Sequence, residues 1–499
     1  MGTKITRRVG NWARIAAALA MLWPAAADAA WVKAETERFV VYGQGREAQV
    51  RDVAMRLSMF DAALRVANPA AAQAPSRKLD VYLVRGIREI QQVAPEAAPT
   101  LGGFYAAGEL GAFAVADANE MGRDDVLFHE YAHAFMLENF PAAYPGWFVE
   151  GWAEYFMTAE VTSRTVTIGS YNPGRLYALF AQDWLPWETV VTKAPFEVPR
   201  QDRSVYYSQA WLMMHYMRSD PVRAAQLTRA TQAIAAGADP VKALEEASGK
   251  PLGELTRGVR LYKKLPMFVI SDPLPTPPEI KVTQLPPSAD DLLLYKLRLE
   301  RDGGKAQGEQ VLADIRARAA KWPGDRMAEL TLARAEFALG DVAAGEAIVK
   351  RRLEQDPKDI ETLLVAGLGQ IQAGDRDLAQ QAARYVAARP LLIKAYGLDQ
   401  GDYRTLLNYV RSRSVEPEFP NDNDVNALLT ARAMAPTVRA SSIMAGQLLL
   451  MRGRRAEAQA VLSIVANDPH GGEAARLAQA LIDGQETSAG KSEVAAPTQ

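Results

Sequence analysis

The sequence predicts an α+β domain with a small sheet, followed by an all-α domain of helical repeats. Strand-like segments alternate with a helical one as far as Val115, and nearly every segment after Asp124 has helical periodicity. A proline-rich stretch at 266–288 separates this region from helical hairpins whose glycines recur at a spacing of 34 residues. We therefore expect two folded domains joined by a linker.

Composition restricts the chemistry of the chain. Its 499 residues carry 57 Lys+Arg against 59 Asp+Glu, a net charge of −2, and 48% of them are hydrophobic. These values exclude a mostly disordered chain and a surface dedicated to nucleic acid, so no nucleic-acid partner is expected. The absence of cysteine excludes disulfides, thiolate nucleophiles and cysteine metal sites. A metal would have to be held by carboxylates and by the four histidines.

The two ends of the chain are predicted to lie outside the folded domains. Residues 1–29 have a basic start, an apolar run over 15–23 and a small-residue cleavage site ending at Ala29, which predicts a signal peptide. We expect an exported protein, periplasmic or secreted. A membrane anchor is the alternative, but the apolar run is shorter than the roughly 20 residues of a spanning helix, so no stable span is expected after signal removal. The polar residues 484–499 predict a disordered tail.

The first domain is expected over 30–265. Residues 39–42 and 79–84 have the β-branched and aromatic content of strands, with a helical pattern over 47–66 between them. Two further strands are predicted at 104–105 and 112–115, joined through a glycine-containing turn. The linker is expected at 266–288, where seven prolines favour an extended, semi-rigid conformation.

The second domain, 289–483, carries a repeated pattern of glycine, small residue and proline. The positions are Gly340, Gly345 and Pro357; Gly374, Ala379 and Pro390; and Gly453, Ala458 and Pro469. This pattern resembles tetratricopeptide repeats, in which glycine ends the first helix, the small residue allows close packing and proline begins the next unit. The resemblance implies a surface for a protein partner. Generic alanine-rich helical hairpins are the alternative.

A metal-binding motif lies on the first predicted helix after the strands. His129 and His133 are four residues apart, so both imidazoles face one side of a helix and can bind the same ion. Glu130 lies beside them and is placed to take a proton from water, whose pKa a zinc ion lowers to about 7. A chance match on a buried helix is the alternative.

Two carboxylates on the next predicted helix supply the remaining groups. Glu150 and Glu154 are also four residues apart, in a segment otherwise rich in Trp, Phe, Tyr and Ala. Carboxylates buried there without partners would be costly. We therefore expect Glu150 to complete the metal site and Glu154 to accept a hydrogen bond from a ligand imidazole.

His129-Glu130-x-x-His133 followed by Glu150-Gly151-x-Ala153-Glu154-Tyr155 resembles the gluzincin branch of zinc metallopeptidases, which includes thermolysin and the aminopeptidases related to leukotriene hydrolase. The resemblance implies a Zn²⁺ site, a peptide or protein substrate and Glu130 as the general base. The interval from His133 to Glu150 is slightly shorter than in the best-known members.

Two further positions take their expected roles from the same resemblance. The segment that begins at Tyr207 is similar to the one that gives gluzincin aminopeptidases their transition-state tyrosine, so Tyr207 is the candidate oxyanion donor. Tyr207, Trp211 and His215 share one helical stripe, so core packing is the alternative for all three. Gluzincins place a substrate-pairing edge strand where this chain has 112–115. Aminopeptidases of the group carry a glutamate there, and this chain has Ala114, which favours an endopeptidase.

The sequence thus predicts an exported zinc-dependent peptidase with a repeat domain for protein binding. Two alternatives stay open. One is a repeat-based scaffold whose peptidase domain is degenerate and non-catalytic. The other is an aminopeptidase.

Overall fold

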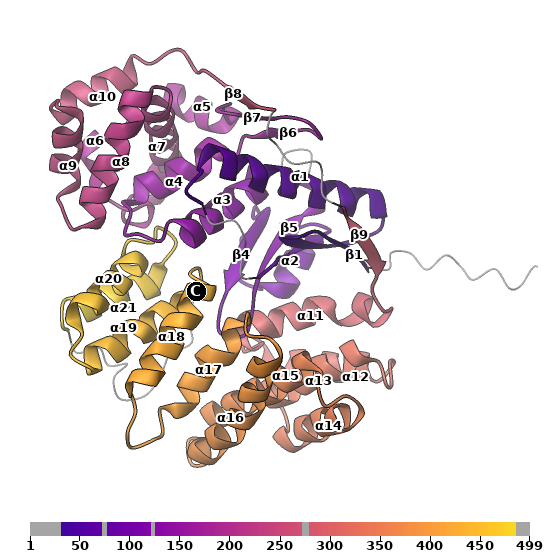
Figure 1. Ribbon diagram of the computed structural model, residues 1–499. Helices are drawn as coiled ribbons and strands as arrows, with labels where there is room; N and C mark the ends of the chain where they lie inside the picture. The colour runs from indigo at the N-terminus through magenta and orange to yellow at the C-terminus, as the bar shows by residue number, and fades with distance from the viewer. Residues whose placement is uncertain (1–30, 72–76, 121–124, 272–278, 486–499) are drawn as a thin grey trace, which may run out of the picture.

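The computed structural model describes residues 31–71, 77–120, 125–271 and 279–485 (Figure 1). The predicted signal peptide, 1–29, and nearly all of the predicted tail lie outside these ranges. The described chain is mixed α+β, with an all-helical repeat region at its C-terminal end.

A six-stranded sheet forms the centre of the first region, in the order β4-β5-β3-β2-β1-β9. Strands β2, β3 and β5 are parallel, and the other neighbours are antiparallel. The four strands expected from the sequence are confirmed: β3 has the predicted bounds, and the other three are slightly longer than predicted. The bounds are β1 (Trp31–Glu35), β2 (Phe39–Gln44), β3 (Leu79–Val84), β4 (Gly103–Ala107), β5 (Ala112–Asp117) and β9 (Lys281–Gln284).

Helices cover both faces of this sheet because its central strands are apolar on both sides. Val81 and Leu83 of β3 belong to the core shared with α1 (Glu47–Ala67) and α3 (Asp125–Asn139). The alternate residues Tyr82 and Val84 pack with α2 (Ile87–Val93) and α11 (Ser288–Asp302) on the other face. The metal motif on α3 is therefore backed by the larger core.

The expected edge strand around Ala114 is wrong. Ala114 on β5 is paired with Val81 of β3 on one side and with Tyr105 of β4 on the other, so β5 is an interior strand. The β4–β5 hairpin folds β4 to the outside of the sheet, and β4 is the free edge at this end. Two short apolar runs do not indicate which of the two strands lies at the edge of the sheet, so this position was not predictable from the sequence.

The proline-rich stretch is more than an extended spacer. Its first part contains β8 (Phe268–Ile270), which joins β6 (Glu160–Val161) and β7 (Val166–Ile168) in a small sheet. Its last part contains β9, which pairs with β1. Both paired segments are free of proline and can donate ladder hydrogen bonds. Since α11 packs on the main sheet, the first helix of the predicted second domain is part of the core of the first.

The remaining helices of the first region continue from α4, which packs on both α3 and α7. Their bounds are α4 (Gly146–Phe156), α5 (Pro173–Ala181), α6 (Trp187–Thr192), α7 (Arg203–Arg218), α8 (Pro221–Ala235), α9 (Pro240–Ser248) and α10 (Leu252–Arg260). Helices α4 and α7 pack closely at Gly151, where an added Cβ would lie 2.5 Å from the carbonyl oxygen of Ala210. This glycine allows the helix that carries Glu150 and Glu154 to approach α7.

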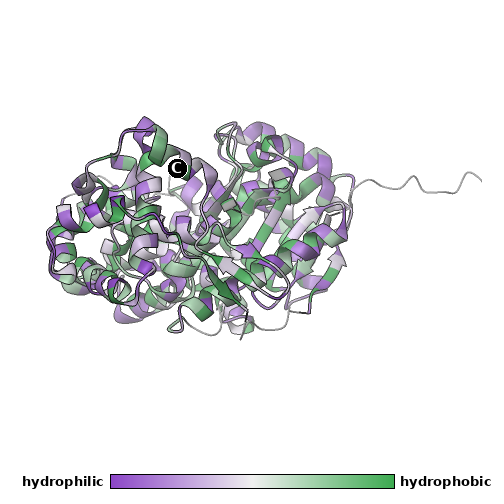
Figure 2. Ribbon diagram, turned by 90° about the horizontal axis from the view of Figure 1, so that it is seen from above, coloured by the Kyte–Doolittle hydropathy of each residue, from purple (hydrophilic) through white to green (hydrophobic). Residues whose placement is uncertain are grey.

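The repeat region is a row of helices in which neighbours along the chain pack together (Figure 1). After α11 the bounds are α12 (Gly308–Ala319), α13 (Arg326–Leu339), α14 (Val342–Gln355), α15 (Ile360–Arg376), α16 (Gln381–Leu398), α17 (Tyr403–Arg413), α18 (Asp422–Met434), α19 (Arg439–Met451), α20 (Arg455–Ala466) and α21 (Gly472–Ile482). The helix-turn-helix repeats are confirmed. Figure 2 shows hydrophilic and hydrophobic residues on the same helices, as amphipathic packing requires.

The repeat positions agree with the predicted pattern in the first and last units. Gly340 caps α13, Gly345 lies against Phe337, and Ala458 is fully buried. In the middle unit the pattern is wrong, because α15 continues to Arg376 and Pro390 lies inside α16.

The described ranges contain no helix both long and apolar enough to cross a membrane.

Candidate metal centre

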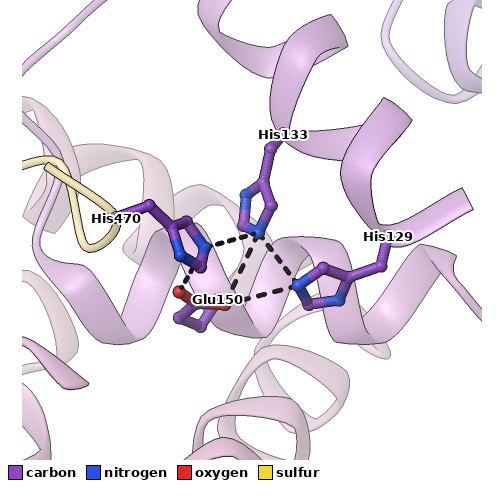
Figure 3. A group of neighbouring side chains, drawn as sticks. All are labelled: His129, His133, Glu150 and His470. Atoms are coloured by element: carbon purple, nitrogen blue, oxygen red, sulfur yellow. Dashed lines mark hydrogen bonds and ion pairs between the residues drawn. The ribbon is translucent and has the colours of Figure 1, made fainter. Parts of the chain in front are cut away.

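Three predicted ligands converge where α3 and α4 pack together (Figure 3). The Nε2 atoms of His129 and His133 lie 3.0 Å apart. Glu150 Oε2 is 3.6 Å from His129 Nε2 and 3.5 Å from His133 Nε2. The helical spacing of the two histidines and the position of Glu150 on α4 thus place three donor atoms around one point.

A fourth donor comes from the far end of the chain. His470 lies on the loop between α20 and α21, and its Nε2 is 3.0 Å from Glu150 Oε1 and 3.4 Å from His133 Nε2. Donor atoms of the four residues all lie within 4.8 Å of one another. In Figure 3 the His470 ring reaches the other three from the yellow C-terminal segment.

The spacing of these atoms fits a tetrahedral ion. Zinc binds imidazole nitrogen and carboxylate oxygen at about 2.0–2.1 Å, so neighbouring ligand atoms of a tetrahedron are about 3.3–3.4 Å apart. The five individual donor–donor distances quoted above run from 3.0 to 3.6 Å, and the whole group lies within 4.8 Å. The group could therefore bind a metal ion with nitrogen and oxygen ligands.

The carboxylate of Glu150 supports the same conclusion. Its side chain is completely buried. Among the residues that the structure describes, neither of its oxygens accepts a hydrogen bond of good geometry, although three imidazoles face it. A buried charge without hydrogen bonds is costly unless a cation compensates it.

The pKa values of Glu150 and the facing histidines depend on one another's charges. Burial alone would raise the pKa of Glu150, but His470 and the two α3 histidines hold it well below its usual value. Burial alone would lower the pKa of His470. The carboxylate of Glu150 has the larger effect and raises this pKa to about 9. Burial lowers the pKa of His133. A negative carboxylate among imidazoles is the charge distribution that a divalent cation stabilises.

Glu154 lies behind His129, near the ring but beyond hydrogen-bond distance. Its Oε1 is 3.7 Å from His129 Nδ1, the ring nitrogen that faces away from Glu150. Arg175 on α5 holds the same carboxylate with two hydrogen bonds, of 2.8 Å from Nε and 2.6 Å from Nη2. Arg175 thereby fixes the Glu154 carboxylate next to the His129 ring.

Tyr207 lies close to this support rather than directly on the ligands. The guanidinium carbon of Arg175 is 4.8 Å from the centroid of the Tyr207 ring. Burial and the charge of Glu150 raise the pKa of Tyr207, so its hydroxyl keeps its proton and is able to donate a hydrogen bond.

Glu130, the predicted general base, is partly buried next to His129. Its charge contributes to the raised pKa of both His129 and His470.

His215 and Trp211 are buried, which agrees with the alternative prediction that they pack in the core. The Nε2 atom of His215 lies 3.0 Å from the carbonyl oxygen of Gly169 and its Nδ1 atom 2.9 Å from the Tyr262 hydroxyl. The histidine therefore ties α7 to neighbouring loops and has no part in the metal centre.

The sequence analysis missed two residues of the site. Arg175 follows Pro173 and Gly174 and carries no motif that marks it. His470 had one available signal: it is one of only four histidines in a chain where metal ligands must be histidines or carboxylates.

Comparisons with known proteins add no assignment. No protein-family model matches the chain, and no curated protein matches it. A solved structure of a thermophilic tetratricopeptide-repeat protein from Thermus thermophilus is 21% identical over 39% of this chain and 99% of that protein, with a TM-score of 0.32.

Proposed function

We propose that the protein is an exported zinc-dependent peptidase whose helical repeats bind a protein partner or substrate. The observation that carries the proposal is the buried Glu150 carboxylate, which accepts no hydrogen bond of good geometry among the described residues and faces His129 and His133, with Glu130 beside them. Two histidines spaced by four residues, an adjacent glutamate and a third carboxylate ligand on the next helix suit hydrolysis more than a structural role.

His129, His133 and Glu150 would hold the ion. When bound, zinc supplies Lewis acidity that polarises a peptide carbonyl and favours attack by water near neutral pH. Glu130 accepts a proton from the attacking water and returns it to the leaving amine. Glu154, held by Arg175, keeps the His129 ring oriented. Tyr207 donates to the oxygen that gains negative charge as the tetrahedral intermediate forms.

An endopeptidase is the preferred form of this activity, since the position of Ala114 lacks a carboxylate that would hold a free N-terminus and β5 is an interior strand. The free edge β4 is where an extended substrate would add by backbone pairing. Acetylated and free forms of one peptide separate the two activities. Cleavage of the free form alone would identify an aminopeptidase instead.

The main test compares the full-length protein with its Glu130→Gln variant, measuring zinc content and the hydrolysis of unfolded casein. The substitution removes the proton acceptor and leaves the ligands, so zinc should stay bound while the rate falls by at least about 100-fold. Glu246→Gln, an exposed position on α9, is the matched control and should behave as wild type. Equal rates for wild type and Glu130→Gln, or a wild-type protein that binds no zinc, would contradict the proposal.

A further inference from the structure

His470 occupies the place that a hydrolytic zinc site normally leaves open. Catalytic zinc has three protein ligands and an open fourth position, whereas structural zinc has four protein ligands. His129, His133 and Glu150 already make a set of three, and His470 Nε2 lies within 3.0 Å of Glu150 and 3.4 Å of His133. The fourth donor belongs to the repeat region, 337 residues after His133.

The loop that carries His470 has a defined conformation. The carboxylate of Asp468 accepts a 2.9 Å hydrogen bond from the His470 backbone N–H and is paired with Arg439 on α19. Gly472 follows with φ of 52°, a left-handed conformation that suits glycine. The loop therefore presents the His470 ring from a fixed turn at the end of the repeats.

A second contact holds the repeat region against the first domain. The tip of the β4–β5 hairpin lies on α17, where the hydroxyl of Tyr403 donates to the Gly108 carbonyl at 2.6 Å. Arg411 forms an ion pair with Glu109, and both side chains are nearly buried. Tyr105 on the edge strand β4 also shares a 2.9 Å hydrogen bond with Thr437. The repeats thus contact both the edge strand and the metal centre.

We propose that His470 is a fourth protein ligand of the metal and that the repeat region thereby closes the peptidase site. This proposal rests on the proposed function. The His470 side chain is 43% exposed, whereas Glu150 is fully buried, so His470 lies at the mouth of the site. Withdrawal of the 467–472 loop frees the fourth position for substrate and water without disturbing the other three ligands. The closed chain is therefore the less active form of the peptidase.

The first experiment compares full-length wild type, His470→Ala and Asn467→Ala, an exposed position on the same loop. Zinc affinity is measured by competition with a chelator, and coordination by the visible absorption of the Co²⁺-loaded proteins. His470→Ala should weaken zinc binding by at least about tenfold, the smallest loss seen when even an outer-shell partner is removed. It should also change the cobalt spectrum, while Asn467→Ala should leave both unchanged.

Casein hydrolysis at saturating zinc gives the second measurement. His470→Ala should cleave faster than wild type by about tenfold or more, because the closed population no longer competes with substrate. An unchanged zinc affinity together with an unchanged cobalt spectrum would overturn the inference and leave the peptidase proposal intact. If wild type and His470→Ala both fail to bind zinc, the proposed function itself fails.

A third variant tests the role of the repeats without touching a ligand. Glu109→Ala removes the hairpin side of the Arg411 ion pair, while Arg411 keeps its 2.8 Å contact with Asp375 inside the repeats. Glu109→Ala should raise the rate of casein hydrolysis, and it should add nothing in the His470→Ala background, because both changes act through the same opening. Additive effects in the double variant would show that the repeats do not act through His470.

Discussion

The two sides of the metal centre differ in burial and in what supports them. On the α3–α4 side, Glu150 is fully buried and Glu154 is held by two hydrogen bonds from Arg175. On the repeat side, the His470 side chain is 43% exposed and lies on a loop held by Asp468 and Arg439. A ligand embedded in a core is costly to move, whereas one on a surface loop is removable. The difference suggests a permanent three-ligand site and a removable fourth ligand.

The largest expected effect comes from Glu150→Gln. This change removes the charge that faces three imidazoles and leaves a neutral amide of similar shape. Zinc affinity in a chelator competition should fall by at least about 100-fold, the upper range for loss of an outer-shell partner. That loss should exceed the one caused by His470→Ala. Similar losses in the two variants would mean that the two sides hold the metal equally.

A smaller effect is expected from Arg175→Met, which leaves the buried Glu154 carboxylate without its two hydrogen bonds. The free energy of unfolding, measured with urea, should drop by about 1–3 kcal/mol. Arg439→Met on the repeat side should cost about 1 kcal/mol or less, since the Arg439 side chain is 37% exposed. Pairing Arg175→Met with Glu154→Gln should recover part of the loss. Equal costs at Arg175 and Arg439 would remove the contrast between the sides.

The smallest expected effect is a loss of folding stability at acidic pH, caused by Asp402 at the start of α17. Burial by itself would raise the pKa of Asp402, but the charge and hydrogen bonds of Arg404 hold it below its usual value. The lowered pKa means that Asp402 stabilises the fold above the unfolded pKa of about 3.9, and that this contribution disappears as pH falls through the folded value. Unfolding by urea at pH 6 and pH 3 should therefore differ by about 1 kcal/mol more in wild type than in Asp402→Asn. If the free energy of unfolding changed by the same amount between pH 6 and pH 3 in both proteins, Asp402 would not be the source of the pH dependence.

Local patterns were sufficient for most of the first region. β-branched and aromatic content predicted β2 and β3, and a helical pattern over 47–66 predicted α1. The spacing of His129 and His133 brought their Nε2 atoms to 3.0 Å because residues four apart share a helix face. These predictions succeeded since each depends on residues within a few turns of one another.

Predictions that depended on pairing across the chain failed. The strand around Ala114 became an interior strand because the hairpin places β4 outside it. The two ends of the proline-rich stretch became β8 and β9 because strand partners distant in sequence were available. Pro390 lies inside α16, so proline did not mark the start of that unit.

The sequence by itself determined the chemistry of this protein: a chain without cysteine, two histidines on one helical face, and carboxylates at Glu150 and Glu154. Only the tertiary structure decided which further groups join them. Arg175 meets Glu154 because α5 packs near α4, and His470 meets Glu150 because the repeats fold back onto the edge of the sheet. Periodicity records which face of a helix is apolar, but long-range docking depends on the summed shape and charge of whole domains, which short-range patterns do not encode.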